Sequence, residues 1–240
     1  MRDCLAEYEK QSDCYSSDIS FIEYMNNWLQ TTKQNVELTT WESYMQYYNG
    51  HIKPYFTGLN LKLSEVKPPH IQGFIDMKTN GGRLDGKPGG LNPKSIRKFH
   101  CIIRSCLKDA LTQNLILYNP ADRVKLPRKS SSFVGKFYNI EQANKLMAVA
   151  NDTDAGLAIM LALYYGLRRS EILGLKWSSV DLKNSTMLIE NVIVRCTTVV
   201  EKQTTKNKSS HRTLPIMPGV GFLNVYILIV HCKINKNNNK

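Results

Sequence analysis

The chain has 240 residues, 42% of them hydrophobic, and a formal net charge of +12 at pH 7. This hydrophobic content excludes a disordered chain, and the length allows one large domain or two modest ones, each with its own core. The large excess of positive charge favours a polyanionic partner, and nucleic acid before a membrane surface.

The six cysteines indicate neither a metal site nor a disulfide framework. No Cys-x-x-Cys pair occurs, and no spacing of Cys and His completes a zinc set. We therefore expect reduced thiols, a cytoplasmic location, and no metal or cofactor. The N-terminus has no apolar signal core, and the apolar run 220–230 is too short to cross a membrane.

The N-terminal part predicts two helices with apolar faces. Asp18 is the expected N-cap of the first, whose apolar residues recur at helical spacing from Phe21 to Leu29. Thr40 is the expected N-cap of the second, which should close at residues 50–54. Trp41 and the tyrosines that follow it lie at helical spacing, which favours packing against a core over stacking on bases.

Two further helices are expected before residue 116. The third should run from Leu63 to about Met77, and the glycine-rich run 79–90 should be a flexible loop. Asn92 and Pro93 open the fourth and longest helix, because Pro is tolerated in a first turn. Its buried stripe is predicted at Ile96, Phe99, Ile103, Leu107 and Leu111.

Positive charge is concentrated on this fourth helix and on the segment after it. From Arg83 to Lys136 there are twelve Lys and Arg residues and three Asp residues, a net charge of +9. Any one of these cations fits a solvated helix face, but the set is typical of a nucleic-acid contact. The candidate DNA-binding residues are Lys94, Arg97, Lys98, Arg104, Lys125, Arg128 and Lys129.

The second half predicts a mixture of helices and strands. Asn139 caps a helix, with Gln142 three residues later, and Leu146 and Val149 are expected to face inward. The runs 186–194 and 197–200 are rich in strand-forming residues. Together with 212–216 they are expected to form a three-stranded sheet.

The stretch 155–177 is the most informative part of the chain. Residues 155–165 are almost all apolar and predict a buried helix, which Gly166 ends by adopting a left-handed conformation. Arg168 then lies at the start of a short second helix, where backbone N–H groups and a guanidinium can converge on an anion. A helical hairpin with an exposed arginine pair explains the stretch equally well.

Two motifs, in order and with a matching N-terminal half, carry a family resemblance over roughly residues 18–216. Residues 166–177, Gly-Leu-Arg-Arg-Ser-Glu-Ile-Leu-Gly-Leu-Lys-Trp, resemble the first active-site box of the tyrosine recombinases, the phage-integrase family. Residues 205–216, Thr-Lys-Asn-Lys-Ser-Ser-His-Arg-Thr-Leu-Pro-Ile, resemble the family's β-hairpin with its catalytic Lys and the strand that follows.

The resemblance implies a mainly α fold with a small antiparallel β-sheet. It implies a helical SAM-like core-binding domain and then a partial α+β catalytic domain, with a small arm-binding domain expected to be missing in front. The implied segments are an N-terminal stub (1–17), the core-binding domain (18–125), a basic linker (126–138), the partial catalytic domain (139–216) and a divergent tail (217–240).

The family's chemistry is DNA cleavage by a tyrosine hydroxyl without metal or ATP, through a phosphotyrosyl intermediate. By resemblance, Arg168 contacts the scissile phosphate and Glu171 orients the site. Lys206 protonates the leaving oxygen, with Lys208 as the alternative because hairpin length varies. Arg169 is expected to be a surface charge or a contact to the DNA backbone.

The family's His-x-x-Arg motif and nucleophilic Tyr are not recognisable after Ile216. Tyr226 lies in an apolar run that predicts packing, so the nucleophile is expected to be absent, as in a truncated or frame-shifted reading frame. The implied partner is double-stranded DNA at recombination (attachment) sites, where the family assembles as a tetramer. The chain is then either an integrase that is inactive alone, or a non-catalytic or decayed DNA-binding relative.

Overall fold

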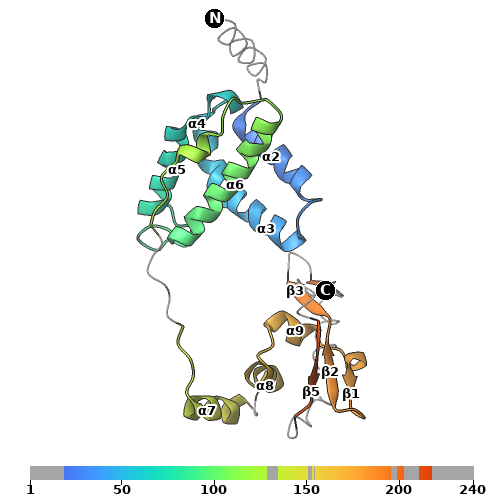
Figure 1. Cartoon of the computed structure of the whole chain (residues 1–240). Helices are drawn as coiled ribbons and strands as arrows, with labels where there is room; N and C mark the ends of the chain where they lie inside the picture. Colours follow the sequence, from blue (N-terminus) through green and yellow to red (C-terminus); the bar gives the residue numbers. More distant parts are fainter. Residues whose placement is uncertain are drawn as a thin grey trace, which may run out of the picture. The chain divides into compact units, whose positions relative to one another are not determined.

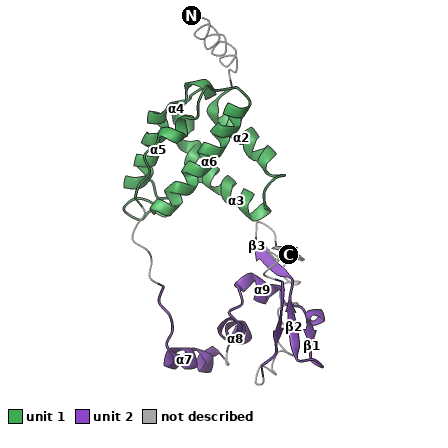
Figure 2. Ribbon diagram, in the orientation of Figure 1, with its two compact units in different colours: residues 1–134 green, residues 135–240 purple. Residues whose placement is uncertain are grey.

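A computed structural model describes residues 19–128, 135–150, 153, 155–195, 199–202 and 211–217. The chain divides into two compact units, residues 1–134 and 135–240 (Figure 2). The first unit is helical, and the second combines helices with short antiparallel strands (Figure 1). The predicted fold class, mainly α with a small antiparallel sheet, is confirmed.

The first described helix, α2 (Phe21–Thr32), begins at a serine cap. The Ser20 hydroxyl accepts a hydrogen bond from the Glu23 N–H at 3.1 Å, which satisfies one of the four unpaired donors of the first turn. Asp18, the predicted cap, lies outside the described residues. The apolar face of α2 is buried as its spacing predicted, with Phe21, Met25 and Leu29 in the core.

The second helix does not close at residues 50–54, and this prediction was wrong. Helix α3 (Leu38–Tyr47), with Glu37 and not Thr40 at its N-cap, continues into a π-helical turn (Tyr48–Ile52) and then α4 (Lys53–Leu59). Pro54 has no N–H to donate, and its ring would clash with a carbonyl inside a regular α-helix. In the wider π-helical turn the Lys53 N–H donates to the Tyr48 carbonyl. A new helix, α4, begins after it, with Pro54 in the first turn of α4.

The third helix starts later than predicted. A 3₁₀ turn (Leu63–Glu65) comes first, and α5 (Pro68–Asn80) begins at the proline pair because the residue before a proline is held in extended conformation. The following loop is closed at its base. Lys78 donates from Nζ to the Gly82 carbonyl at 3.3 Å, and the Lys78 carbonyl accepts a hydrogen bond from the Leu91 N–H at 2.8 Å.

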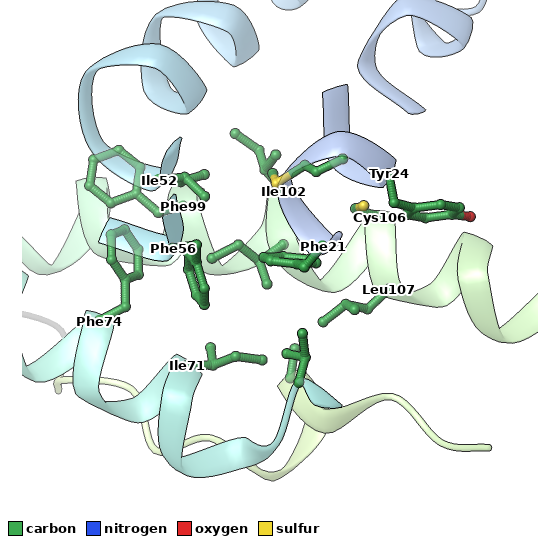
Figure 3. Packing of buried hydrophobic residues seen from close by; sticks show 14 of the residues in the cluster. Phe21, Tyr24, Ile52, Phe56, Ile71, Phe74, Phe99, Ile102, Cys106 and Leu107 are labelled. Atoms are coloured by element: carbon green, nitrogen blue, oxygen red, sulfur yellow. The ribbon is translucent and has the colours of Figure 1, made fainter. Parts of the chain in front are cut away.

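Helix α6 (Pro93–Thr112) is confirmed and organises the first unit. Its cap is Asn92, whose side chain accepts from the Lys94 N–H at 2.8 Å. Of the predicted stripe, all but Leu111 is fully buried, and Leu111 packs at the edge of the core. Figure 3 shows Phe99 among the aromatic side chains of α4 and α5. Its ring centroid lies 4.8 Å from that of His51, 5.3 Å from Tyr47 and 6.0 Å from Phe74.

The chain after α6 is attached to the first unit as far as Pro127. A 3₁₀ turn (Pro120–Arg123) is held by Asn119, whose Nδ2 donates to the Arg104 carbonyl at 2.9 Å. Gln72 of α5 then pairs with the backbone of Lys125 in both directions, at 2.8 and 3.2 Å. Arg97 of α6 donates from Nη2 to the Pro127 carbonyl at 2.8 Å, so the start of the predicted linker 126–138 is held to the first unit by a hydrogen bond.

The second unit starts with α7 (Ile140–Ala150), which has the predicted capping box. Asn139 and Gln142 exchange backbone–side-chain hydrogen bonds at 2.8 and 3.1 Å. Val149, however, is 68% exposed, so the prediction that it faces inward was wrong. Helix α7 packs against α8 (Gly156–Tyr165), and its fully buried residue is Ala150.

Helix α8 ends as predicted, with Gly166 at φ 62° in the left-handed region. The short helix α9 (Arg169–Gly174) and a 3₁₀ turn (Trp177–Ser179) lead into the strands. A second core forms from the apolar residues of these elements and the sheet: Leu157, Leu161, Leu167, Leu175, Met187 and Ile189.

A three-stranded sheet exists, but the predicted membership was wrong: 180–181 takes the place expected for 197–200, and the run 186–194 is divided between two sheets. Strands β1 (Val180–Asp181), β2 (Thr186–Ile189) and β5 (Arg212–Pro215) form one antiparallel sheet in that order. Strands β3 (Val192–Arg195) and β4 (Val199–Lys202) form a separate two-stranded sheet. The chain leaves the first sheet after Ile189 and passes over Gly174, where an added Cβ would lie 2.4 Å from the Asn191 carbonyl oxygen. Only glycine allows this approach.

Candidate functional site

A buried carboxylate connects α9 to the sheet. Glu171 is 1% exposed, and its two oxygens accept hydrogen bonds from two arginines. Arg168, the N-cap of α9, donates from Nη1 to Oε1 at 2.9 Å and from its backbone N–H to Oε2 at 3.0 Å. Arg212 of β5 donates from Nη2 to Oε2 at 3.1 Å and from Nη1 to Oε1 at 3.4 Å. We call these three residues the Arg–Glu–Arg triad.

The two arginines keep Glu171 ionised against the effect of burial. Desolvation alone would raise the pKa of its carboxyl, but the hydrogen bonds and charges of Arg212 and Arg168 together hold that pKa below its ordinary value. Because the folded-state pKa is lowered, the carboxylate's contribution to stability is present at neutral pH. It is lost as the pH falls through that lowered pKa.

Arg212 is the residue that the sequence did not reveal. It lies 41 residues after Glu171, and no local spacing links the two. A buried carboxylate requires a cationic or hydrogen-bonding partner, and this requirement could have suggested an arginine for Glu171. Arg168, three residues earlier in the chain, already met it, so nothing in the sequence called for a second arginine. The expected hairpin residues Lys206 and Lys208 lie outside the described residues, so their roles stay predictions.

The side chain of Glu190, which follows β2, contacts Ser179 in the turn before β1 and lies near His211, just before β5. Ser179 is buried and donates from Oγ to Glu190 Oε1 at 2.8 Å, while His211 Nε2 lies 4.0 Å from Oε2. The adjacent register pairs Ile189 with Arg212. This pairing fixes the strand position from which Arg212 reaches Glu171.

The first unit contains a groove between α3 and α6, with a cavity of about 620 Å³. Hydroxyl and aromatic side chains of α3 form one wall, and Lys94, Arg97 and Lys98 of α6 form the other. Lys94 and Lys98 are exposed, and Lys98 Nζ lies 3.4 Å from the Tyr47 hydroxyl oxygen. The lining residues are Trp28, Thr39, Thr40, Ser43, Tyr44, Tyr47, Lys94, Arg97, Lys98, Cys101, Ile102 and Ser105.

The other candidate cations divide between internal contacts and the surface. Arg97 donates from Nη2 to the Pro127 carbonyl at 2.8 Å, and Arg104 forms an ion pair with Asp122. Lys125 and Arg128 are exposed, and Lys129 lies outside the described residues. The groove therefore presents two exposed lysines, Lys94 and Lys98, from the predicted set.

Neither a metal cluster nor a membrane span is found in the described part of the chain. No group of three or more His, Cys, Asp or Glu side chains could hold an ion among the residues that the structure covers. None of the described helices is long and apolar enough to cross a membrane.

Two family models match the chain. The model for the phage integrase N-terminal SAM-like domain matches residues 20–78, and the model for the phage integrase family matches residues 136–235. A tyrosine recombinase XerC-like protein of Caldanaerobacter subterraneus is 22% identical over 214 residues, which cover 83% of this chain and 52% of that protein. A tyrosine recombinase XerC of Yersinia pestis is 31% identical over 109 residues, 43% of this chain and 35% of that protein.

Solved structures share the fold at low sequence identity. A Tn1549 transposon integrase in complex with a circular intermediate DNA has a TM-score of 0.63 at 15% identity, covering 92% of this chain and 66% of that one. A lambda integrase dimer bound to a COC′ core site has a TM-score of 0.60 at 15% identity, covering 82% and 49%. The chain thus spans about half the length of its XerC-like relative, at 52%.

Proposed function

This chain belongs to the phage integrase family of tyrosine recombinases, and on that premise we propose that it binds double-stranded DNA at recombination sites. The first unit supplies a basic groove, and the second supplies an arginine site for a backbone phosphate. The activity of a whole recombinase would include strand exchange through a tetramer on DNA, in the cytoplasm. In that reaction Arg168 would neutralise charge on the scissile phosphate, and Lys206 or Lys208 would protonate the leaving oxygen.

The groove between α3 and α6 is the observation that carries this proposal. Lys94 and Lys98 stand exposed on one wall, and hydroxyl groups of Thr39, Thr40 and Ser43 line the other. Lysines neutralise phosphates and release counterions, while Ser and Thr hydroxyls donate to phosphates or base edges. The solved relatives in complex with DNA support the same partner.

Cys101 provides a direct test of the groove. Its exposed thiol lines the cavity, whereas Cys106, five residues further along α6, is fully buried. Burial, with the nearby charge of Asp109, raises the pKa of the Cys106 thiol well above its ordinary value and keeps it unreactive. Duplex DNA is expected to slow alkylation of Cys101 several-fold, measured by peptide mass spectrometry. Cys106 should stay unmodified with or without DNA. An unchanged rate at Cys101 under saturating DNA would place binding elsewhere.

We expect the 240-residue polypeptide to bind DNA without cleaving it. Residues 217–240 contain no His-x-x-Arg, and Tyr226 is the only tyrosine after Arg212. Covalent cleavage requires a nucleophile held in line with the phosphorus, and its loss removes the route itself. Removing one charge-stabilising donor costs only about 10²–10³ in rate. A denaturing gel should show no protein–DNA adduct on nicked or intact duplexes. An adduct that disappears in the Tyr226→Phe variant would refute this expectation.

A further inference from the structure

We infer that Arg97 connects the α3–α6 groove to the linker, so that DNA bound in the groove strengthens the attachment of the linker's start to α6. In the DNA-bound state Arg97 donates both to a DNA phosphate and to the Pro127 carbonyl. This inference rests on the proposed function, because it assigns a regulatory consequence to DNA binding in that same groove. It makes Arg97 a positioning residue for Pro127 as well as a DNA contact.

Arg97 lies on the same face of α6 as the groove lysines. Residues three and four apart are neighbours on a helix surface, which places Arg97 beside Lys94 on one side and Cys101 on the other. All three line the groove, as does Lys98, the residue after Arg97. A phosphate attracted by the two lysines therefore arrives next to the Arg97 guanidinium.

The Arg97 guanidinium still has donors for an acceptor in the groove. A guanidinium carries five N–H donors and no acceptor. In the described part of the chain, Nη2 donates to the Pro127 carbonyl at 2.8 Å, whereas the buried Nε has no hydrogen-bond partner. Such a buried donor is rare in proteins, because it has lost its hydrogen bonds to water. A phosphate oxygen would satisfy it, and a charged acceptor forms stronger hydrogen bonds than a neutral one.

Two hydrogen-bonded attachments hold the chain where the linker starts. Lys125, just before the linker, is held by Gln72 of α5, which does not line the groove. Pro127 is held by Arg97, which does. Arg128 comes next and is exposed. Of these two attachments, the one through Arg97 is therefore the one that DNA in the groove can change.

The rigidity of the guanidinium transmits the effect. Because the group is planar, a phosphate that fixes its orientation also fixes the donor that points to Pro127. A lysine at this position would offer a compact ammonium on a flexible stem, without that geometry. The coupling is reciprocal, so DNA that strengthens the attachment of Pro127 is itself bound more tightly while Pro127 is attached.

Trypsin cleavage after Arg128, followed by peptide mass spectrometry, measures how often this segment opens. At low protease concentration the cleavage rate follows the population of the open form. A saturating duplex DNA of mixed sequence should slow cleavage of the original chain about threefold or more, the effect of one strengthened hydrogen bond. Arg97→Gln should be cleaved about threefold faster than the original chain without DNA, because the bond to Pro127 is lost. Saturating DNA should then leave its cleavage rate nearly unchanged.

Two further variants separate this coupling from other effects. Gln72→Ala is the matched control, because it frees Lys125 and leaves the groove intact. It should be cleaved faster without DNA, and DNA should still slow its cleavage by the same factor as in the original chain. Arg97→Lys keeps the charge and should bind DNA within about threefold of the original chain, but without protection of Arg128. Fluorescence anisotropy with a labelled duplex confirms saturation for each variant.

A folding check accompanies each variant. Slow alkylation of the buried Cys106 thiol shows that α6 remains folded. Arg97→Lys carries the comparison if Arg97→Gln does not fold.

The outcomes distinguish this inference from the proposed function. Absence of DNA binding by the original chain would refute the proposed function and this inference with it. If the chain binds DNA but cleavage after Arg128 is unchanged or faster, the inference is overturned and the proposed function stands. If DNA slows cleavage equally in the original chain and in the Arg97 variants, DNA shields Arg128 directly, and the inference is overturned as well.

Discussion

Replacing Lys94 and Lys98 together by Glu is expected to lower the affinity for duplex DNA by about a hundredfold or more. Each lysine is exposed on the same wall of the α3–α6 groove, one turn apart on α6. A hydrogen bond to a charged group contributes about 1.5–3 kcal/mol, and a carboxylate in its place repels the phosphate. The salt dependence of binding should fall in parallel, by about one unit of slope for each lost phosphate contact.

These two positions give a sharper test than the wider predicted set. Arg97 donates to the Pro127 carbonyl and Arg104 pairs with Asp122, so charge reversal there would also disturb the fold. Glu at position 94 stands in the first turn of α6, where the helix dipole favours a negative charge. The double variant should therefore remain folded.

The matched control reverses two other exposed lysines of the first unit, Lys53 on α4 and Lys67 before α5. Neither lines the groove. The Lys53→Glu, Lys67→Glu variant changes the net charge by the same amount, so long-range attraction falls equally in both double variants. Equal losses of affinity in the two would mean that total charge, and not the groove, determines binding.

Sequence reasoning succeeded where a local side chain determines the backbone. Asn92 with Pro93, Asn139 with Gln142, and Gly166 each act within four residues, and each begins or ends a helix as predicted. The burial of Phe99 and Ile103 followed from helical spacing alone. The family resemblance supplied the fold class, although its two motifs, residues 166–177 and 205–216, both lie in the second unit.

Sequence reasoning failed where a contact between residues distant in the sequence, or a rare backbone geometry, determines the structure. Pro54 predicted the end of a helix, but one π-helical turn carries the chain past it. The run 186–194 was predicted to lie in one sheet, yet its residues from Val192 onward belong to a second sheet, after the chain has passed over Gly174. No pattern within a short window could pair Arg212 with Glu171. Of these three failures, the strand and the Arg212 pairing involve contacts between residues that are distant in the sequence.

Replacing Phe99 by Ala is expected to destabilise the first unit by about 3–5 kcal/mol, the usual effect of removing a buried aromatic side chain. Phe99 is fully buried on α6 and lies against the rings of Tyr47, His51 and Phe74. Transient opening should then become about a hundredfold more frequent or higher, since each 1.4 kcal/mol is a factor of ten. Alkylation of the buried Cys106 thiol should accelerate by a similar factor, which reports the first unit specifically.

Phe137→Ala is the matched control, because it is the same substitution at a side chain that is 91% exposed. Surface changes of this kind usually shift stability by no more than about 0.5 kcal/mol, so Cys106 should stay protected. A Phe99→Ala variant with unchanged Cys106 labelling would mean that the aromatic cluster does not hold α6 in place.

Helix α6 contributes to the core with one face and carries the groove lysines on another. The core variant and the groove variant should therefore have different effects. Phe99→Ala should accelerate Cys106 labelling and, while the unit stays mostly folded, change DNA affinity little. Lys94→Glu with Lys98→Glu should lower DNA affinity by the factor given above and leave Cys106 protected. If instead each variant produced both effects, the charge of the groove would be inseparable from the packing beneath it. The lysines would then act on DNA only by keeping α6 folded.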